Sequence, residues 1–320
     1  MSAAAGLGGS LAAASIQELS RRVAPAYLVG VGEVPHYVAE YYGELLQLLR
    51  GACSSGGRIL LLLERPFWLD GLFDRWLSGK DRDLARAFSG KEPPLCGSAG
   101  LKFFEDLRSL GSSGPGSISC RCLDLSARDP GPRCAEFGLV PPGKELAAAN
   151  AELAGLLAAG RQDGFPAARE DFLFARASEA IRRENPDKVF LFAGSFHAGR
   201  RGGRPFGDGF LRPVFARLAE ACGREALRLL LFPVDGTYGR LRRAADGVII
   251  ESADCGGLFG EGFRKELRSA LLAAGAEKLL AETAKLEYAG GHAEEFAEFA
   301  GNHDLLLARR GVTADLRRAE

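Results

Sequence analysis

Almost continuous apolar runs alternate along this chain with segments of helical spacing, and this alternation restricts the possible folds more than any other feature. Residues 188–194 are Lys-Val-Phe-Leu-Phe-Ala-Gly, whereas residues 168–184 place Leu, Ala and Phe three and four positions apart. Strands buried on both faces have such runs, and helices between them cover the sheet. The pattern predicts an α/β fold with a largely parallel central sheet, flanked by helices on both faces and carrying a helical insertion. We predict strands at residues 26–32, 58–63, 117–125, 188–194, 227–234, 247–251 and 303–308, and helices at residues 37–50, 67–77, 99–110, 145–159, 168–184, 209–222 and 260–287.

The length of 320 residues allows one large or two medium domains, and we predict one. Residues 1–17, rich in alanine and glycine, are predicted to be a flexible tail, and residues 18–320 a single α/β domain. Residues 126–143 contain four prolines, so we expect irregular structure there. The helices around 145–184 are predicted to form an insertion or lid within about residues 126–184. Residues 78–98, charged and then proline-rich, are predicted to form a loop or a second insertion.

Charge and cysteine content exclude several classes of protein. Lysine plus arginine and aspartate plus glutamate both total 41, so no net field favours nucleic acid or an anionic membrane. No apolar stretch approaches the roughly 20 residues that span a bilayer, and the N-terminus lacks the features of a secretory signal. Seven scattered cysteines without a CxxC support neither a disulfide framework nor a thiolate zinc site. We predict a cytoplasmic protein with reduced thiols and neither a nucleic-acid nor a membrane partner, its oligomeric state being unknown.

Polar residues follow the first predicted strand at the point where it ends, in the order Gly32-Glu33-Val34-Pro35-His36. In an open α/β sheet the carboxyl ends of the strands border the ligand crevice. The three-residue spacing brings the Glu33 carboxylate within reach of the His36 imidazole, where it would fix the tautomer and raise the basicity of the ring. A general base requires this arrangement. The alternative is a helix N-terminus at which Glu33 favours the macrodipole and His36 has no chemical role.

The second predicted strand, Ile59 to Leu63, ends on Glu64 and Arg65. A carboxylate beside five apolar residues is costly unless it is paired or hydrated, so Glu64 is a candidate for the same crevice. Arg65 points the other way if the strand continues, and we expect it to contact a ligand or a separate partner. The alternative for Glu64 is a carboxylate in solvent.

Another strand, residues 188–194, leads into Ser195-Phe196-His197, and His197 is the second histidine at a strand end. The basic, glycine-rich residues 199–204 follow it and could hold a carboxylate or phosphate, with Arg200 nearest to the strand. A solvated surface loop is the alternative. Ser195 is not a nucleophile elbow, because G-x-S-x-G is absent.

Further candidates are less firmly placed. Arg176, in the helix before this strand, points either inward to a site or outward to solvent. Asp235 and Tyr238 follow the apolar run that ends near Phe232, so they are candidates for binding substrate in the same crevice. His292 and His303 lie outside any motif, and we interpret them as structural.

The P-loop, the dinucleotide-binding G-x-G-x-x-G and H-E-x-x-H are absent, but a set of shorter motifs occurs in order. These motifs are Gly32-Glu33-x-x-His36, a second strand ending in Glu64, a helix with Arg176, and a strand closing on Gly194-Ser195-Phe196-His197. This order resembles the superfamily of erythromycin esterases, ChaN-like and Tiki-like proteins, and within it the erythromycin esterases. The family's R-x-x-x-M-A helix reads Arg176-Ala177-Ser178-Glu179-Ala180 here, without the methionine. Residues 304–314 also resemble the closing strand of erythromycin esterases.

The resemblance implies a hydrolase in which Glu33, His36, Glu64 and His197 are catalytic. Erythromycin esterases use the motif histidine to activate water against a lactone, which implies an ester, lactone or amide carbonyl of a small molecule or peptide as substrate. Arg176 would then bind a substrate anion. Tiki-type members are metal-dependent proteases and ChaN-like members bind haem, so a divalent metal held by the same four residues and a haem site are alternatives. A natural-product tailoring enzyme on the same scaffold is a further one.

Overall fold

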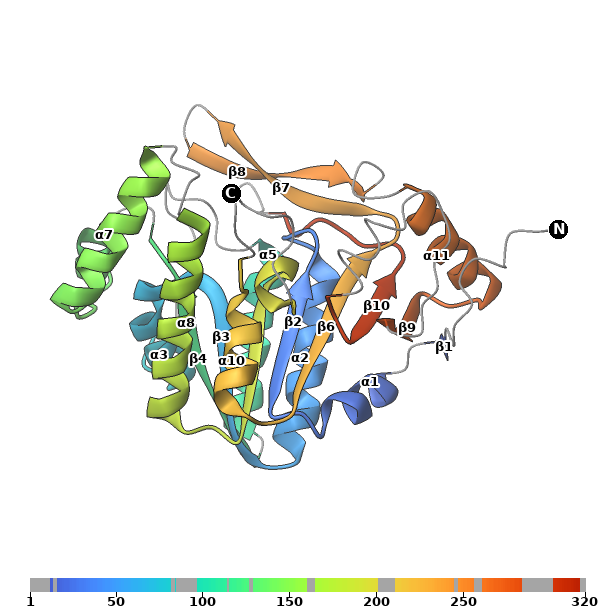
Figure 1. The fold of residues 1–320 in the computed structure, drawn as a ribbon, viewed down its shortest axis with the longest axis horizontal. Helices are drawn as coiled ribbons and strands as arrows, with labels where there is room; N and C mark the ends of the chain where they lie inside the picture. The colour runs from blue at the N-terminus through green and yellow to red at the C-terminus, as the bar shows by residue number, and fades with distance from the viewer. Residues whose placement is uncertain are drawn as a thin grey trace.

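The predicted apolar runs form one sheet at the centre of the protein (Figure 1). The computed structural model describes residues 12–13, 16–81, 84, 97–113, 115–126, 129–159, 165–200, 211–244, 247–255, 261–283 and 302–316. Within them the sheet has eight strands in the order β1-β9-β10-β6-β2-β5-β3-β4. The strands in this order are β1 (Ala12–Ala13), β9 (Lys278–Glu282), β10 (Leu305–Arg309), β6 (Ala226–Pro233), β2 (Leu28–Glu33), β5 (Lys188–Gly194), β3 (Gly57–Pro66) and β4 (Gly116–Asp124).

All neighbouring strands from β10 to β4 run parallel, and β9 and β1 add an antiparallel edge. Alternate residues of the central strands enter separate apolar clusters on the two faces of the sheet: Leu61 and Phe190 lie on one face, and Leu62 and Leu191 on the other. Each of these four residues is at most 1% exposed. Burial on both faces explains why the runs are apolar throughout rather than alternating.

Helices cover both faces of the sheet. The first face is covered by α1 (Ile16–Val23), α2 (Ala39–Ser54), α3 (Asp70–Leu77) and α5 (Ser98–Ser113). The second face is covered by α8 (Phe165–Glu184), α10 (Val214–Cys222) and α11 (Glu261–Ala273). The short helices η1 (Phe67–Leu69) and α9 (Ser195–Ala198) follow β3 and β5 directly. The predicted fold class is therefore confirmed.

Two predicted elements differ in the structure. The helix expected at residues 260–287 ends at Ala273, because Gly275 adopts a left-handed φ of 60° and β9 begins at Lys278. The strand expected at 247–251 does form, as β8 (Gly247–Asp254), but it pairs with β7 (Thr237–Ala244) in a separate hairpin rather than with the central sheet. Figure 1 shows this hairpin across the edge at which the parallel strands end.

Within the stretch expected to be irregular, residues 126–143, a short helix forms instead: α6 (Pro130–Glu136). The side chain of Asp129 accepts a hydrogen bond of 2.9 Å from the backbone N–H of Gly131, and Pro130 occupies the first helical position. Proline is favourable there because its missing N–H would have no partner within the helix. The prolines therefore begin a helix rather than prevent one.

Of the predicted insertion, α8 is part of the layer on the sheet, since Leu173, Ala177 and Ala180 are buried against it. Helix α7 (Lys144–Ala158) lies outside α8 (Figure 1). Within the predicted tail, Ala12–Ala13 pair with β9 and α1 begins at Ile16, while residues 1–11 and 14–15 lie outside the described residues. Most of the predicted loop 78–98 also lies outside them. The single domain and the lid stay predictions.

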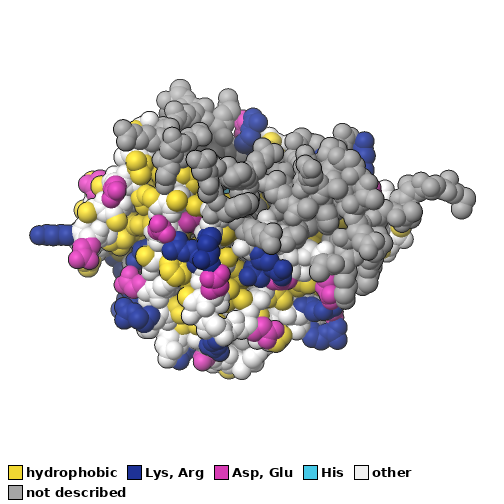
Figure 2. Space-filling model, in the orientation of Figure 1, with side chains coloured by type: hydrophobic (Ala, Val, Ile, Leu, Met, Phe, Trp, Pro, Cys, Tyr) yellow, Lys and Arg dark blue, Asp and Glu magenta, His cyan; other side chains and the backbone are white. Residues whose placement is uncertain are grey.

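The surface is mixed in charge. Figure 2 shows lysine and arginine side chains interspersed with aspartate and glutamate on the face seen. Among the described residues, no helix is both long enough and apolar enough to cross a membrane.

Candidate functional site

Glu33 and His36 meet at the carboxyl end of β2. The Nδ1 atom of His36 lies 2.7 Å from Oε1 of Glu33. The Glu33 side chain is 3% exposed, whereas that of His36 is 48% exposed. A carboxylate can only accept this hydrogen bond, so the proton lies on Nδ1 and the lone pair of a neutral ring lies on Nε2. Within the described residues, Nε2 makes no hydrogen bond.

The pKa of His36 is raised above its ordinary value. Desolvation by the surrounding protein lowers this pKa, but the charge of the Glu33 carboxylate and its hydrogen bond raise it more, and Glu64 adds to the rise. The predicted carboxylate–imidazole pair therefore forms, with a more basic ring than that of a free histidine.

Glu64 ends the buried part of β3 and is bonded on both oxygens. Its Oε2 accepts a 2.7 Å hydrogen bond from the backbone N–H of Gly194, and its Oε1 accepts one of 2.7 Å from Nη2 of Arg169. Oε1 is also 3.3 Å from Nε2 of His197. Burial raises the pKa of this carboxyl, but His197 and Arg169 outweigh the burial, and the pKa lies well below its ordinary value. Glu64 is therefore a carboxylate, 12% exposed, that stays ionised.

His197 lies between two carboxylates. Its Nδ1 bonds to Glu170, and its Nε2 faces Glu64. Burial lowers the pKa of this ring, yet the two carboxylates raise it to about 10. Nδ1 shares its hydrogen bond with Glu170, whereas Nε2 forms an ion pair with Oε1 of Glu64 at 3.3 Å and lies within hydrogen-bond distance, 3.2 Å, of Nη1 of Arg169. The two carboxylates favour the protonated ring. A histidine held in this state cannot act as a base near neutral pH.

Gly194 brings these groups together. A Cβ atom on this residue would lie 3.1 Å from Cε1 of His36 and 3.4 Å from Oε2 of Glu64. Both side chains therefore contact the same point of the backbone, and only glycine leaves space for them. The four predicted residues Glu33, His36, Glu64 and His197 form one cluster at the carboxyl edge of the sheet.

Three members of the cluster were not predicted from the sequence. Arg169 bonds to Asp124 at the end of β4 through Nε (2.9 Å) and Nη2 (2.6 Å) as well as to Glu64. Glu170, 1% exposed, joins His197 to the backbone N–H of Val214 at the start of α10, at 2.5 Å. The R-x-x-x-M-A spacing also allows Arg169, but residues 169–174 have leucine in place of the methionine and phenylalanine in place of the alanine, so the motif does not single this arginine out.

Arg176 was the arginine predicted for the site, and the structure places it elsewhere. Its guanidinium bonds to Asp70 of α3 at 2.7 Å and to the carbonyl of Cys122 at 3.4 Å, and it stacks over the ring of Phe67. Two helical turns separate it from Arg169, which occupies the position expected of it. Arg176 ties α8 to α3 and β4.

The other predicted binding residues divide into two groups. Arg65 lies at the cluster: its Nη1 donates to the carbonyl of Glu64 at 2.9 Å, and its charge lowers the pKa of His36. Asp235 instead accepts from the backbone N–H of Gly311 at 2.6 Å and pairs with Arg268 at 3.1 Å, so its carboxylate holds a loop.

Two more candidates contact other parts of the protein. Arg200 pairs with Asp304, and Tyr238 packs against the apolar core, next to Gly239, whose N–H donates to the carbonyl of Tyr37. A role of either residue in binding substrate stays a prediction. His303 is 2% exposed, beside Gly32, which agrees with a structural role. His292 lies outside the described residues.

The donors of the cluster do not fit a divalent metal ion. Both oxygens of Glu64 are taken by Gly194, Arg169 and His197, and Nδ1 of His36 is taken by Glu33. The guanidinium of Arg169 also places a permanent positive charge among the candidate ligands. Across the described residues, no group of three or more His, Cys, Asp and Glu side chains is arranged to hold a metal ion.

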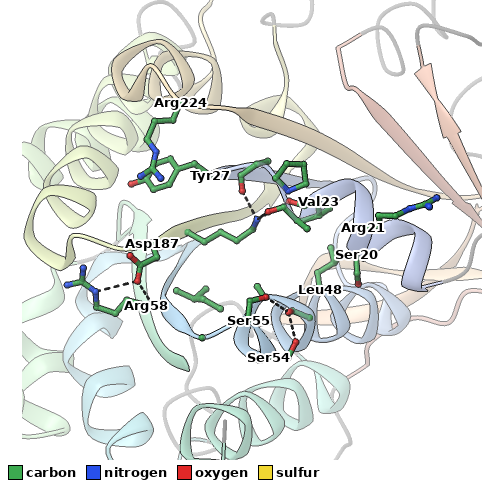
Figure 3. A pocket seen from close by; sticks show the side chains of 18 residues that line it. Ser20, Arg21, Val23, Tyr27, Leu48, Ser54, Ser55, Arg58, Asp187 and Arg224 are labelled. Carbon is green, nitrogen blue, oxygen red and sulfur yellow. Dashed lines mark hydrogen bonds and ion pairs between the residues drawn. The ribbon is translucent and has the colours of Figure 1, made fainter. Parts of the chain in front are cut away.

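A pocket of about 500 Å³ opens at the opposite, amino-terminal edge of the sheet (Figure 3). Two of its basic side chains are held by the protein itself. The ammonium of Lys188 donates to the carbonyls of Val23 and Ala24 at 2.9 Å and to that of Ala26 at 2.5 Å, and Arg224 stacks on Tyr27. None of the candidate residues lines this pocket.

No protein-family model and no curated protein matches this sequence. Solved structures do match. A protein from Bacillus cereus has a TM-score of 0.64 at 13% identity, over 96% of this chain and 94% of that one. A protein described as a succinoglycan biosynthesis protein has a TM-score of 0.65 at 13% identity, over 94% and 92%. A histidine-to-asparagine variant of an erythromycin esterase in its open conformation has a TM-score of 0.60 at 14% identity, over 93% and 94%. The chain therefore shares the fold of an erythromycin esterase over almost its whole length.

Proposed function

We propose that this protein is a hydrolase in which His36 activates water against an ester, lactone or amide carbonyl. The observation that carries the proposal is the state of His36. It is oriented by a buried carboxylate 2.7 Å away, and its ring is half exposed at the edge of the sheet where substrates bind in this class of fold. The shared fold with an erythromycin esterase supports the same function.

In this mechanism, Nε2 of His36 takes a proton from water as the oxygen attacks the carbonyl carbon. The imidazolium is stabilised by Glu33, whose carboxylate already accepts from Nδ1. When the tetrahedral intermediate collapses, the same proton passes from Nε2 to the leaving alcohol or amine, and the acid product is released. General-base catalysis of this kind supplies about 10²- to 10⁴-fold in rate.

The other residues of the cluster fix the backbone beside His36 and stabilise charge. Glu64, held by Arg169 and His197, fixes the backbone N–H of Gly194, against which the His36 ring lies. We assign the stabilisation of the developing oxyanion to Arg65, because its charge already acts on His36 and its guanidinium is held at the end of β3. His197 positions Glu64 and does not exchange protons with the substrate.

The test is hydrolysis of a panel of p-nitrophenyl esters, erythromycin and anilides by the protein and by its His36→Gln variant. We expect the variant to lose about 10²-fold or more of kcat, with an unchanged circular dichroism spectrum. The control is Arg58→Gln, at the opposite edge of the sheet, which should retain full activity. Full activity of His36→Gln, or no hydrolysis of any carbonyl substrate, contradicts the proposal.

The alternatives have distinct results in the same assay. A metal-dependent hydrolase loses activity on incubation with a chelator and regains it with a divalent ion. A haem-binding protein shows a Soret band on titration with haem, and a tailoring enzyme joins two substrates, which product analysis by mass spectrometry detects. We expect none of these results from the cluster described above.

A further inference from the structure

The residue after His36 has an unusual backbone conformation. Tyr37 has a φ of 60°, which L-residues other than glycine rarely adopt. Such a conformation persists only where the surrounding structure determines it. The carbonyl of Tyr37 accepts two backbone hydrogen bonds, one of 3.0 Å from Gly239 of β7 and one of 2.8 Å from Asp315. The direction in which the chain leaves His36 is thus set by residues more than two hundred positions away.

Asp315 belongs to residues 311–316, which we call the 311–316 segment. This segment lies between the start of α2 and the start of β7. On the α2 side, Thr313 accepts from the backbone N–H of Ala39 at 2.9 Å and donates to the carboxylate of Glu40 through its N–H (2.8 Å) and its hydroxyl (2.7 Å). On the β7 side, Ala314 donates to the hydroxyl of Thr237 at 3.1 Å. The segment therefore joins the loop that carries His36 and Tyr37 to the hairpin of β7 and β8.

The side chain of Asp315 anchors this segment to α5. It is 1% exposed and accepts three backbone hydrogen bonds, from Gly97 (2.8 Å), Ala99 (2.7 Å) and Gly100 (3.1 Å). These N–H groups lie at the start of α5, which packs against α2 on the same face of the sheet. Burial raises the pKa of this carboxyl, although the three N–H donors oppose the rise. A carboxylate capping a helix N-terminus is a strong anchor.

We propose that Asp315 is a positioning residue for His36. Its carboxylate holds the 311–316 segment on α5, its N–H fixes the carbonyl of Tyr37, and the fixed Tyr37 directs the His36 ring toward Glu33. Among the described residues, the charged groups that act on the His36 ring are Glu33, Glu64 and Arg65, so the segment works through geometry. The consequence for catalysis rests on the proposed function, but the position of the ring does not.

The experiment is an NMR titration of the His36 ring, whose resonance is identified by its loss in His36→Gln. We expect Asp315→Asn to lower the pKa of His36 by about half a unit or more, toward the ordinary value, because the contact with Glu33 loosens. Asp315→Glu should restore part of the shift. Glu184→Gln, which breaks a pair between the last residue of α8 and Arg121 of β4, is the control for lost stability and should leave the His36 pKa unchanged.

A second variant separates geometry from charge, since Asp315→Asn also removes a negative charge near Arg65. The double variant Thr237→Val with Thr313→Ala changes no charge and weakens the segment at two side-chain bonds, and Thr313 is exposed. It should shift the His36 pKa in the same direction. If only Asp315→Asn shifts it, or if neither does, the positioning role is overturned. Absence of hydrolysis would contradict the proposed function and leave this titration valid.

Discussion

At the scale of single residues, the two histidines of the cluster differ because their surroundings differ. His36 pairs with Glu33 and is half open to solvent, which suits the proton exchange with a substrate that we propose. His197 is buried between Glu64 and Glu170, and the two acids raise its pKa to about 10. The same side chain suits a base in one position and favours the protonated form at neutral pH in the other.

The pairing of Glu33 with His36 predicts a pH effect. Glu33→Gln removes the charge that raises the pKa of His36, so that pKa should fall. A base acts when it is neutral, and activity is lost as pH falls through its pKa. The acid limb of the kcat/KM profile should therefore move to lower pH, while kcat falls because an amide stabilises the imidazolium less. The measurement is a pH–rate profile of both proteins on one ester. An acid limb at the same pH in both would show that the limb does not report His36.

At the scale of elements, the cluster depends on how closely α9 and α10 approach β2 and β5. A Cβ on Gly30 would lie 2.6 Å from Cδ2 of Phe215, which is fully buried, and 3.2 Å from the carbonyl of Ala198. Gly194 has the same role under His36. Glycines in the strands thus let the short helix α9, which carries His197, lie directly on the sheet.

The space around each glycine predicts opposite effects on stability for two glycine-to-alanine changes, one at the contact with α10 and one at an open position of α2. Gly30→Ala should reduce the free energy of unfolding by about 1–3 kcal/mol, because Phe215 must move within a filled core. Gly43→Ala, inside α2 with nothing within 4 Å of the new Cβ, should raise it by about 0.5–1 kcal/mol. Urea unfolding of both variants measures the difference. A neutral or stabilising Gly30→Ala would mean that α10 does not pack on β2 as closely as described.

At the scale of the whole molecule, equal numbers of acidic and basic residues give no net charge, yet ionic groups gather at one edge of the sheet. Asp124, Arg169, Glu64, His197 and Glu170 join the ends of β4, β3 and β5 to α8. Removing one partner from such a partly buried set costs more than the net contribution of the set, because a charge is left without compensation. The cluster therefore links the proposed chemistry to the stability of the protein.

This link predicts a dependence of stability on pH. The pKa of His197 is about 10 in the folded protein against an ordinary 6.5, so its contribution is complete below pH 6.5 and decreases as pH rises toward 10. Between pH 7 and 8, this contribution of His197 to the free energy of unfolding should decrease by about 1.4 kcal/mol per pH unit. His197→Gln should reduce this slope, and urea unfolding at several pH values measures it. Equal slopes in the two proteins would contradict a protonated His197.

Much of this protein could be predicted from local sequence. The apolar runs at residues 58–63 and 188–194 determined buried parallel strands, and the polar residues that follow them determined the edge at which Glu64 and His197 lie. Such patterns are local because a strand buried on both faces must be apolar throughout. The hydrogen bond between Glu33 and His36 could also be predicted locally, since the two residues are three positions apart in the sequence.

Only the tertiary structure decided which distant residues complete the cluster. Arg169 and Arg176 lie on the same helix at positions that sequence spacing does not distinguish, and the direction of the helix across β4 sends only Arg169 to Glu64. The contact of Asp315 with Tyr37 spans most of the chain. Such contacts depend on how helices pack on a sheet, and that packing is set by many side chains together rather than by any one pattern.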